Sequence, residues 1–297
     1  MSNTLLKVSN LTKKFASLKA IDNLSFEVYE GEVLGIIGQN GAGKSTLFRS
    51  IMNYFTDYTG EILFKDKPVK KIKLEQIVFL PEERSLDEKS TIKDQIKFFG
   101  KLNKKKVSDQ KIEQMLEYFE VKGKPTDKIK SLSKGNMQKV QLICALIYEP
   151  EFVILDEPFS GLDPYNINLL QNIILDYKNK GKTIIFSSHN MENVEKVSDR
   201  LLMLKDGKKE LYGTIKEIRD EFERLEIIVE TDFDLSFLNE INYVESVTKD
   251  TYWHIKITDE KYGEEIANKI HDVCGYVKLF SQLPPTLNEI FNMRVKS

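Results

Sequence analysis

The sequence has little of several features that would point to particular protein classes. Only two cysteines, Cys144 and Cys274, occur in 297 residues, and they fit neither a disulfide framework nor a metal-ligand spacing. Long apolar runs are also missing: no stretch approaches the roughly 18 to 20 residues that span a bilayer, and no apolar segment follows a basic start. We therefore expect a protein of the reducing cell interior whose membrane role, if it has one, comes through a partner.

Charge of one sign is not in excess either. The chain has 44 basic and 46 acidic residues, a formal net charge of −2 and a pI near 6.1. This balance gives no overall attraction to nucleic acid or to an anionic membrane, so no nucleic-acid partner is expected. Lysine clusters at 65–73 and 104–106 are interpreted as solvated faces. A content of 41% apolar residues is enough for a sizeable core and indicates a globular chain.

A glycine-rich turn separates an apolar stretch from an apolar helix pattern at residues 32–52. It matches the pattern G-x-x-x-x-G-K-[S/T], whose glycines let backbone amides point at a polyphosphate on the positive end of the helix. Lys44 is expected to bridge the terminal phosphates, Ser45 to bind Mg²⁺ and Thr46 to reach an inner phosphate. The predicted phosphate-binding residues are Gly38, Asn40, Gly41, Ala42, Gly43, Lys44, Ser45 and Thr46.

Two further apolar segments end in residues with catalytic chemistry. Residues 152–155 are all apolar and precede Asp156 and Glu157, which predicts a buried strand with two carboxylates at its carboxyl end, where α/β sheets bind ligands. Asp156 is expected to hold Mg²⁺ through water and Glu157 to orient the attacking water, although acids at strand ends also cap helices. The segment 182–190 ends at His189, whose position alone fits a surface residue as well as a γ-phosphate sensor.

Residues 131–141, "SLSKGNMQKVQ", read as the start of a helix. Ser131 and Ser133 are possible caps, and the apolar face of this helix ends before Pro150. Small polar residues and free amides in a first turn are typical of an anion-binding helix start. This segment, however, lies far along the sequence from the predicted phosphate loop.

Taken in order, these motifs resemble the ATP-binding subunit of an ABC transporter over about residues 4–212. "GQNGAGKST" resembles its phosphate loop, "FVILDEP" its acidic strand, "SGLD" its D-loop, "SSH" its switch histidine and "LSKGNMQK" its signature. Upstream, "LTKKFASLKAIDNLSFEV" is similar to the family's opening antiparallel strands, with Phe15 where an aromatic residue stacks on adenine. Without the resemblance, plain packing remains the alternative for Phe15.

The resemblance implies that two such ATPase subunits face each other head to tail, with each ATP between one copy's phosphate loop and the other copy's signature. The signature residues Ser133, Lys134, Gly135 and Asn136 would contact the γ-phosphate bound by the other copy, and Asp163 would couple the two sites. Glu157, His189 and Lys44 form the implied catalytic set, with ATP and Mg²⁺ as cofactors. Integral membrane permease subunits are expected to dock near residues 80–100, which places the protein at the cytoplasmic face of the cell membrane.

The sequence departs from the family's pattern in two places. The usual signature L-S-G-G-Q reads L-S-K-G-N at residues 132–136, and both changes are compatible with anion binding. Where a glutamine normally follows a strand and its proline, this chain has Glu82 after Pro81. Glu82 either coordinates Mg²⁺ as a carboxylate or turns outward, and our hypothesis is that it ligates the metal.

The order of patterns predicts two domains. Residues 1–212 are expected to form a RecA-like α/β ATPase core with an antiparallel β subdomain and a helical insert at about 84–150, in which Ile92, Ile96, Phe98 and Phe99 are interpreted mainly as core. Residues 213–297 read as strand, helix, strand, strand, helix, strand, helix, a small ferredoxin-like domain. His254, His271 and Cys274 in that domain share no ligand spacing. Its "TLNEIF" ending resembles an extension of some bacterial export ATPases.

The function predicted from these patterns is ATP hydrolysis that powers a transporter, an exporter of drugs or of amphipathic, antimicrobial-type peptides, through separate membrane subunits. The alternative is a soluble ABC-type ATPase that acts on the ribosome or on nucleic acid. Relatives of that kind typically carry two ATPase modules or a long coiled-coil insertion. This chain has one phosphate loop and a short insert, which favours the transporter.

Overall fold

The computed structural model describes residues 3–72, 76–83 and 86–296. Contacts along the chain divide it into two compact units, residues 1–214 and 215–297. Among the residues that the structure describes, none of the helices has the length and apolar character of a membrane-spanning segment.

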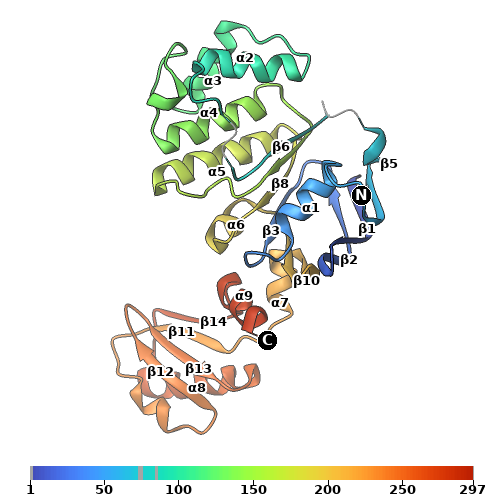
Figure 1. The fold of residues 1–297 in the computed structure, drawn as a ribbon. Helices are drawn as coiled ribbons and strands as arrows, with labels where there is room; N and C mark the ends of the chain where they lie inside the picture. The colour runs from blue at the N-terminus through green and yellow to red at the C-terminus, as the bar shows by residue number, and fades with distance from the viewer. Residues whose placement is uncertain (1–2, 73–75, 84–85, 297) are drawn as a thin grey trace. The chain divides into compact units, whose positions relative to one another are not determined.

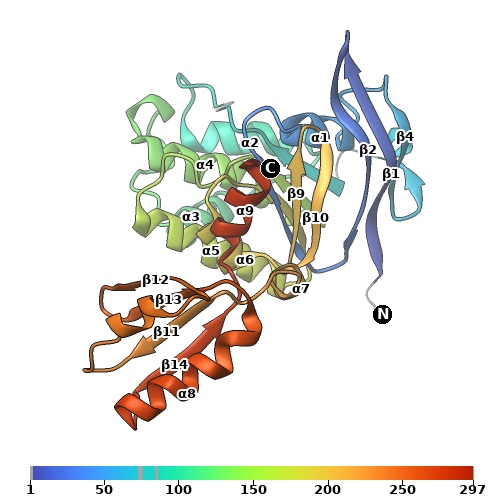
Figure 2. The ribbon, with the colours of Figure 1, turned by 90° about the horizontal axis from the view of Figure 1, so that it is seen from below.

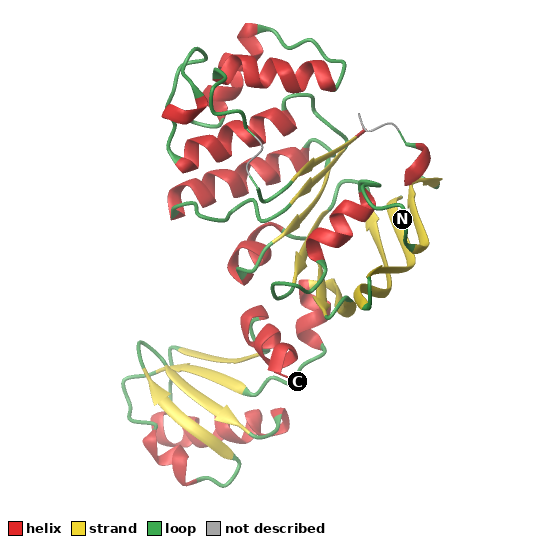
Figure 3. Cartoon of the chain, viewed as in Figure 1, coloured by secondary structure: helices red, strands yellow, loops and turns green. Residues whose placement is uncertain are grey.

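The first unit contains a sheet of six strands and a sheet of four strands (Figures 1 and 3). The six strands lie in the order β10-β9-β3-β8-β7-β6, and all of them are parallel except β10, which runs antiparallel to β9. Every residue of β3, β7 and β8 is buried, as expected for mainly apolar strands that are covered on both faces. These strands are β3 (Val33–Ile37), β6 (Ile77–Leu80), β7 (Phe152–Leu155), β8 (Thr183–Ser187), β9 (Arg200–Lys205) and β10 (Lys208–Thr214).

The second sheet of this unit is antiparallel, in the order β2-β1-β4-β5, and Figure 2 shows β2, β1 and β4 side by side. Its apolar face shares one core with helix α1 (Lys44–Ile51) and with the six-stranded sheet. The rings of Phe64 and Phe152 stack across this core with centroids 5.9 Å apart. The strands are β1 (Thr4–Phe15), β2 (Leu18–Tyr29), β4 (Thr59–Phe64) and β5 (Lys67–Pro68), and a short 3-10 helix, η1 (Val69–Lys71), follows.

Helices α2 (Ile92–Leu102), α3 (Asp109–Tyr118) and α4 (Lys134–Leu146) form a helical layer of the first unit, and α2 and α3 both pack against α4 (Figure 1). The 3-10 helix η3 (Ile129–Ser131) precedes α4, and α5 (Pro164–Asn179) and α6 (Met191–Val197) complete the unit. Of the apolar residues interpreted as core in this segment, Ile92 and Ile96 are buried, whereas Phe98 is 54% exposed. Phe98 is therefore the exception to the interpretation of these residues mainly as core, because it lies on the solvent side of α2.

The second unit has a four-stranded antiparallel sheet in the order β12-β13-β11-β14. This is the strand order of a ferredoxin-like βαββαβ unit, with α8 (Gly263–Cys274) as its second crossover helix. Together with the parallel sheet of the first unit it confirms the predicted α/β fold class. The remaining elements are α7 (Ile215–Asp220), β11 (Glu226–Glu230), η4 (Ser236–Glu240), β12 (Val244–Lys249), β13 (Trp253–Ile257), η5 (Glu260–Tyr262), β14 (Leu279–Leu283) and α9 (Leu287–Lys296).

Two elements of this unit differ from the prediction: helix α7 (Ile215–Asp220), which precedes the first strand, was not expected, and the first crossover is of another helix type. The first crossover was expected to be an α-helix, and it is the five-residue 3-10 helix η4. Asp234 starts it by accepting hydrogen bonds from the backbone N–H and hydroxyl of Ser236 (2.9 and 2.6 Å), a local turn that competes with an α-helix. Leu235 and Leu238, both fully buried, are three residues apart, which matches the 3-10 period.

Candidate functional site

The glycine-rich turn lies between β3 and α1, at residues 38–43. Gly43, which precedes α1, has φ +104°, and a Cβ there would lie 2.5 Å from the carbonyl oxygen of Ala20. Only glycine fits this position without a backbone shift. Helix α1 has no side-chain cap and no acidic residue in its first turn, so its first amides stay available to an anion.

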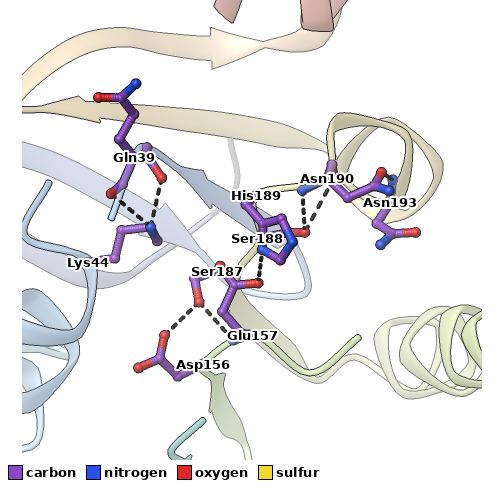
Figure 4. Close-up of polar contacts among 10 residues, drawn as sticks. Gln39, Lys44, Asp156, Glu157, Ser187, Ser188, His189, Asn190 and Asn193 are labelled. Atoms are coloured by element: carbon purple, nitrogen blue, oxygen red, sulfur yellow. Dashed lines mark hydrogen bonds and ion pairs between the residues drawn. The ribbon is translucent and has the colours of Figure 1, made fainter. Parts of the chain in front are cut away.

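The Lys44 side chain folds back over this turn. Its ammonium group donates to the carbonyl oxygens of Gly38 (2.7 Å) and Gln39 (3.2 Å), and the residue is only 8% exposed (Figure 4). No carboxylate of the described residues pairs with this buried cation. Because a buried ammonium group is stabilised by negative charge, Lys44 and the free amides of α1 make this turn a site for an anion.

Asp156 and Glu157 follow β7, and Ser187 ends the neighbouring strand β8. The fully buried Ser187 hydroxyl donates to Oδ1 of Asp156 (2.7 Å) and accepts from the backbone N–H of Glu157 (2.8 Å) (Figure 4). One hydroxyl therefore joins both acidic residues to the adjacent strand. Ser187 was not among the site residues predicted from the sequence; the signal that could have indicated it is a polar residue at the end of a buried apolar stretch, two residues before His189.

Glu157 contacts the third predicted catalytic residue. Its Oε2 lies 2.9 Å from Nδ1 of His189, and the Glu157 residue is 8% exposed while the His189 side chain is 69% exposed. Glu157 also has φ 48°, the left-handed region that non-glycine residues adopt rarely and mostly where the surrounding structure requires it. The Glu157 carboxylate is thus held in place by the buried backbone that carries it, and the His189 imidazole lies on its solvent side.

Figure 4 shows Lys44, Asp156, Glu157, Ser187 and His189 in one region, because β3, β8 and β7 are adjacent parallel strands and all of these residues follow or end them. The carboxyl ends of parallel strands meet at one edge of a sheet. That edge combines an anion-binding turn, a cation, two carboxylates and an imidazole. Such a set can bind a polyphosphate and direct a water molecule at it.

Two of the three predicted magnesium ligands fit that ion. No group of three His, Cys, Asp or Glu side chains gathers for a metal in the part of the chain that the structure describes. Ser45, directly after Lys44, offers a hydroxyl, and the 5% exposed Asp156 offers a carboxylate. One hydroxyl and one carboxylate suit Mg²⁺, which keeps water ligands and takes the rest from substrate phosphates.

Glu82 lies beyond the end of β6 and is exposed. Its side chain forms no ion pair or hydrogen bond within the described residues. The next residue, Glu83, accepts a 3.4 Å hydrogen bond at its backbone oxygen from Gln141 of α4. Residues 84 and 85, part of the segment predicted to dock a permease, lie outside the described residues.

Phe15 ends β1 and is 41% exposed. The Phe55 ring meets it edge to face with centroids 5.2 Å apart, and the Lys13 ammonium lies 4.5 Å from its centroid. Lys13 is itself buried and paired with Asp57 at 2.6 Å. Phe15 is therefore held in place by its neighbours while part of its ring stays open to a flat ligand.

The signature residues 132–136 start α4, and Asp163 starts α5. Ser133 is the N-cap of α4, and Lys134 beside it is exposed. The Asp163 carboxylate accepts from the backbone and side-chain amides of Asn166 (2.9 and 2.5 Å), and these hydrogen bonds hold the pKa of Asp163 below its usual value. Among the described residues, no hydrogen bond or ion pair joins residues 132–136 to the phosphate loop.

Comparisons with known proteins agree with this geometry. Residues 21–160 match the model of the ABC transporter family, and residues 213–295 match that of the C-terminal domain of ATP-binding proteins like DrrA1-3. The chain is 36% identical over 295 residues, 98% of both chains, to the ABC transporter ATP-binding protein YhaQ of Bacillus subtilis (strain 168). It is 32% identical to Nod factor export ATP-binding protein I of Rhizobium meliloti, over 96% of this chain and 86% of that one.

A solved ATP-binding subunit of an ABC transporter has the same fold as the first unit. The two superpose with a TM-score of 0.67 and 29% sequence identity, over 73% of this chain and 93% of that one. Family, fold and full-length relatives agree, and they confirm the resemblance drawn from the motifs. The chain belongs to the ABC transporter family, as an ATP-binding subunit that hydrolyses ATP.

Proposed function

We propose that this subunit hydrolyses Mg²⁺-bound ATP between two head-to-tail copies and so drives export through separate membrane subunits. The observation that carries the proposal is the bonded group Asp156–Ser187–Glu157–His189 at the same sheet edge as Lys44. Bound Mg²⁺ would neutralise charge on the β- and γ-phosphates. The chain's own side chains bind the ATP and orient the water that attacks it.

The residues divide the chemistry between binding and activation. The loop 38–46 and Lys44 hold the phosphates, with Ser45 and Asp156 as metal ligands and Phe15 against the adenine ring. Glu157 orients the attacking water and takes up its proton, and His189, bonded to that carboxylate, contacts the γ-phosphate from the solvent side. Both groups stand ready before the reaction, which is the preorganisation that lowers such barriers.

The signature supports a second copy as part of the site. The start of helix α4 is formed by the signature residues Ser133, Lys134, Gly135 and Asn136. Among the described residues, none of them forms a hydrogen bond or ion pair with the phosphate loop of the same chain. A helix start of this kind attracts phosphate. In a head-to-tail dimer it meets the ATP of the other copy, and Asp163, at the adjacent helix start, links the two sites.

Glu157→Gln tests the catalytic assignment. The variant should bind ATP, lose hydrolysis by about 100-fold or more, and accumulate an ATP-bound dimer on size-exclusion chromatography, because the neutral amide cannot take up a proton. Glu32→Gln is a matched control: Glu32 is also 8% exposed but precedes β3, at the opposite end of the strands. Normal hydrolysis by Glu157→Gln, or equal losses in both variants, would contradict the assignment.

Glu82 is proposed as a further Mg²⁺ ligand, from its place directly after Pro81 at the end of β6. Its exposed carboxylate is free to turn towards the metal. If it does, Glu82→Gln should shift the Mg²⁺ concentration needed for half-maximal ATPase rate. An unchanged rate and Mg²⁺ dependence would remove Glu82 from the metal site.

Export through membrane subunits at the cytoplasmic face of the membrane is supported by the full-length likeness to a Nod factor export protein. The substrates we propose are drugs or amphipathic peptides. They would cross the membrane through permease subunits that dock near residues 80–100 of this chain. Purification of the tagged chain from its own cells should retain a multi-span integral membrane protein, identified by mass spectrometry. Retention of ribosomal proteins instead would favour the alternative function.

A further inference from the structure

The side chain of Asn136, which stands where the usual signature has glutamine, is held at both of its ends. Its Oδ1 accepts a hydrogen bond from the backbone N–H of Lys122 at 2.9 Å. Its Nδ2 donates to the hydroxyl oxygen of Ser133 at 3.0 Å, and its own backbone N–H donates to the same oxygen at 3.3 Å. These contacts join the start of α4 to the segment that comes after α3.

The contact with Lys122 fixes which way the amide of Asn136 points. A backbone N–H can only donate, so the atom of Asn136 that faces it must be the carbonyl oxygen. The NH₂ group must then face Ser133. The direction of the Asn136–Ser133 hydrogen bond is therefore set by the chemistry of the Lys122 backbone.

This direction determines what the Ser133 hydroxyl can still do. A hydroxyl oxygen has two acceptor positions and one proton. Both acceptor positions face N–H groups of Asn136, so the only remaining capacity is donation. Ser133 is exposed, and its proton has no acceptor among the described residues. The hydroxyl is thus set as an outward donor, which suits a phosphate oxygen that can only accept.

We propose that Asn136 is a positioning residue that presets the Ser133 hydroxyl to donate to the γ-phosphate of the ATP held by the other copy. The inference rests on the proposed dimer function and assigns separate roles to two signature residues. Ser133 contacts the phosphate, and Asn136 orients the hydroxyl proton of Ser133. At the start of α5, Asn166 binds Asp163 in the same way, but a carboxylate has no proton to present.

Asn136→Asp tests the inference with almost no change of shape. One carboxylate oxygen still accepts from Lys122, but the other now accepts from Ser133, which turns the hydroxyl proton inward and points a lone pair at the phosphate. Loss of a hydrogen bond to a charged group corresponds to about a 10- to 100-fold fall in ATPase rate. The melting temperature and the ATP affinity of the isolated copy should stay near those of the parent protein.

The added negative charge of this variant needs a separate control, which a double-mutant cycle provides. In Ser133→Ala the hydroxyl is absent, so Asn136→Asp should have no further effect beyond about twofold. A fall of similar size in both backgrounds would show that charge repulsion or structural damage is responsible, and it would overturn the inference. The same rate for Asn136→Asp and the parent protein would also overturn it.

Failure of this inference can be distinguished from failure of the proposed function. If the parent protein hydrolyses ATP and Glu157→Gln traps a dimer, the proposed function stands whatever Asn136→Asp does. If no ATP-dependent dimer forms, the proposed function fails first. Measuring all variants for hydrolysis, for ATP affinity and for dimer formation distinguishes these results.

Discussion

Replacing Ser187 by alanine tests whether the bridge between β7 and β8 holds the catalytic acids. The substitution removes one oxygen atom from a fully buried position. It leaves the backbone N–H of Glu157 without its acceptor and Asp156 without a donor. An unpaired buried N–H costs about 1–3 kcal/mol, and a lost hydrogen bond to a carboxylate costs a similar amount. Because the two losses share one site and do not simply add, we expect about 2–4 kcal/mol less stability.

Ser50→Ala is the matched control for this experiment. Ser50 is equally buried, but its hydroxyl donates to the carbonyl oxygen of Thr46 within the same helix, 2.8 Å away. That carbonyl keeps its place in the helical hydrogen-bond ladder, so the loss should be about 0–1 kcal/mol. Urea unfolding followed by far-ultraviolet circular dichroism gives both values. A difference below about 0.5 kcal/mol between the two variants would refute the bridging role of Ser187.

The same variant has a catalytic readout. Without its anchor, the left-handed backbone at Glu157 can relax and move the carboxylate from the attacking water. A misplacement of this kind should lower kcat by about 10- to 100-fold. If Ser187→Ala loses stability but keeps its full ATPase rate, the bridge supports the fold without positioning the acid.

Two further predictions use other parts of the chain. The hydrogen bond that the His254 ring donates to the Glu226 carboxylate raises the pKa of His254 above 6.5. The pair therefore adds stability that is complete below that value and is lost as pH rises through the folded-state pKa. An NMR titration should show that Glu226→Gln lowers the pKa of His254, and an unchanged pKa would contradict the pairing. Gly43→Ala should abolish ATP binding, because the added Cβ would lie 2.5 Å from the backbone oxygen of Ala20. Gly181→Ala is the control: Gly181 has φ +77° but open space around it, so this variant should bind ATP normally and lose only about 1–2 kcal/mol of stability. Isothermal titration would measure the binding and urea unfolding the stability.

Much of the fold can be predicted from short stretches of the sequence, such as apolar runs and the glycine-rich motif. The apolar runs 33–37, 152–155 and 184–186 indicate buried parallel strands, and glycines followed by lysine and serine indicate a phosphate loop. These signals are local, because each run or motif carries its own periodicity and turn chemistry. The fold class and the family were predictable on this basis.

The contacts of the candidate site were not predictable in the same way. The hydrogen bond from Ser187 to Asp156 exists because β8 pairs with β7 in one particular register. Neither the pairing nor the register can be predicted from the sequence of either strand alone. The strand order also brings His189 to Glu157. Likewise, the three-residue spacing of Leu235 and Leu238 is found in both helix types, and the turn at Asp234 adds the preference for the tighter one.

The position of Trp253 has a practical consequence for studying this protein. It is the only tryptophan in the chain, and it belongs to the hydrophobic core of the second unit, where its strand partner is Val229. Its intrinsic fluorescence therefore reports the local environment of that unit, while the site for ATP has no optical label of its own. A tryptophan introduced at Phe15 would give nucleotide binding a direct signal and leave the natural one as an internal reference.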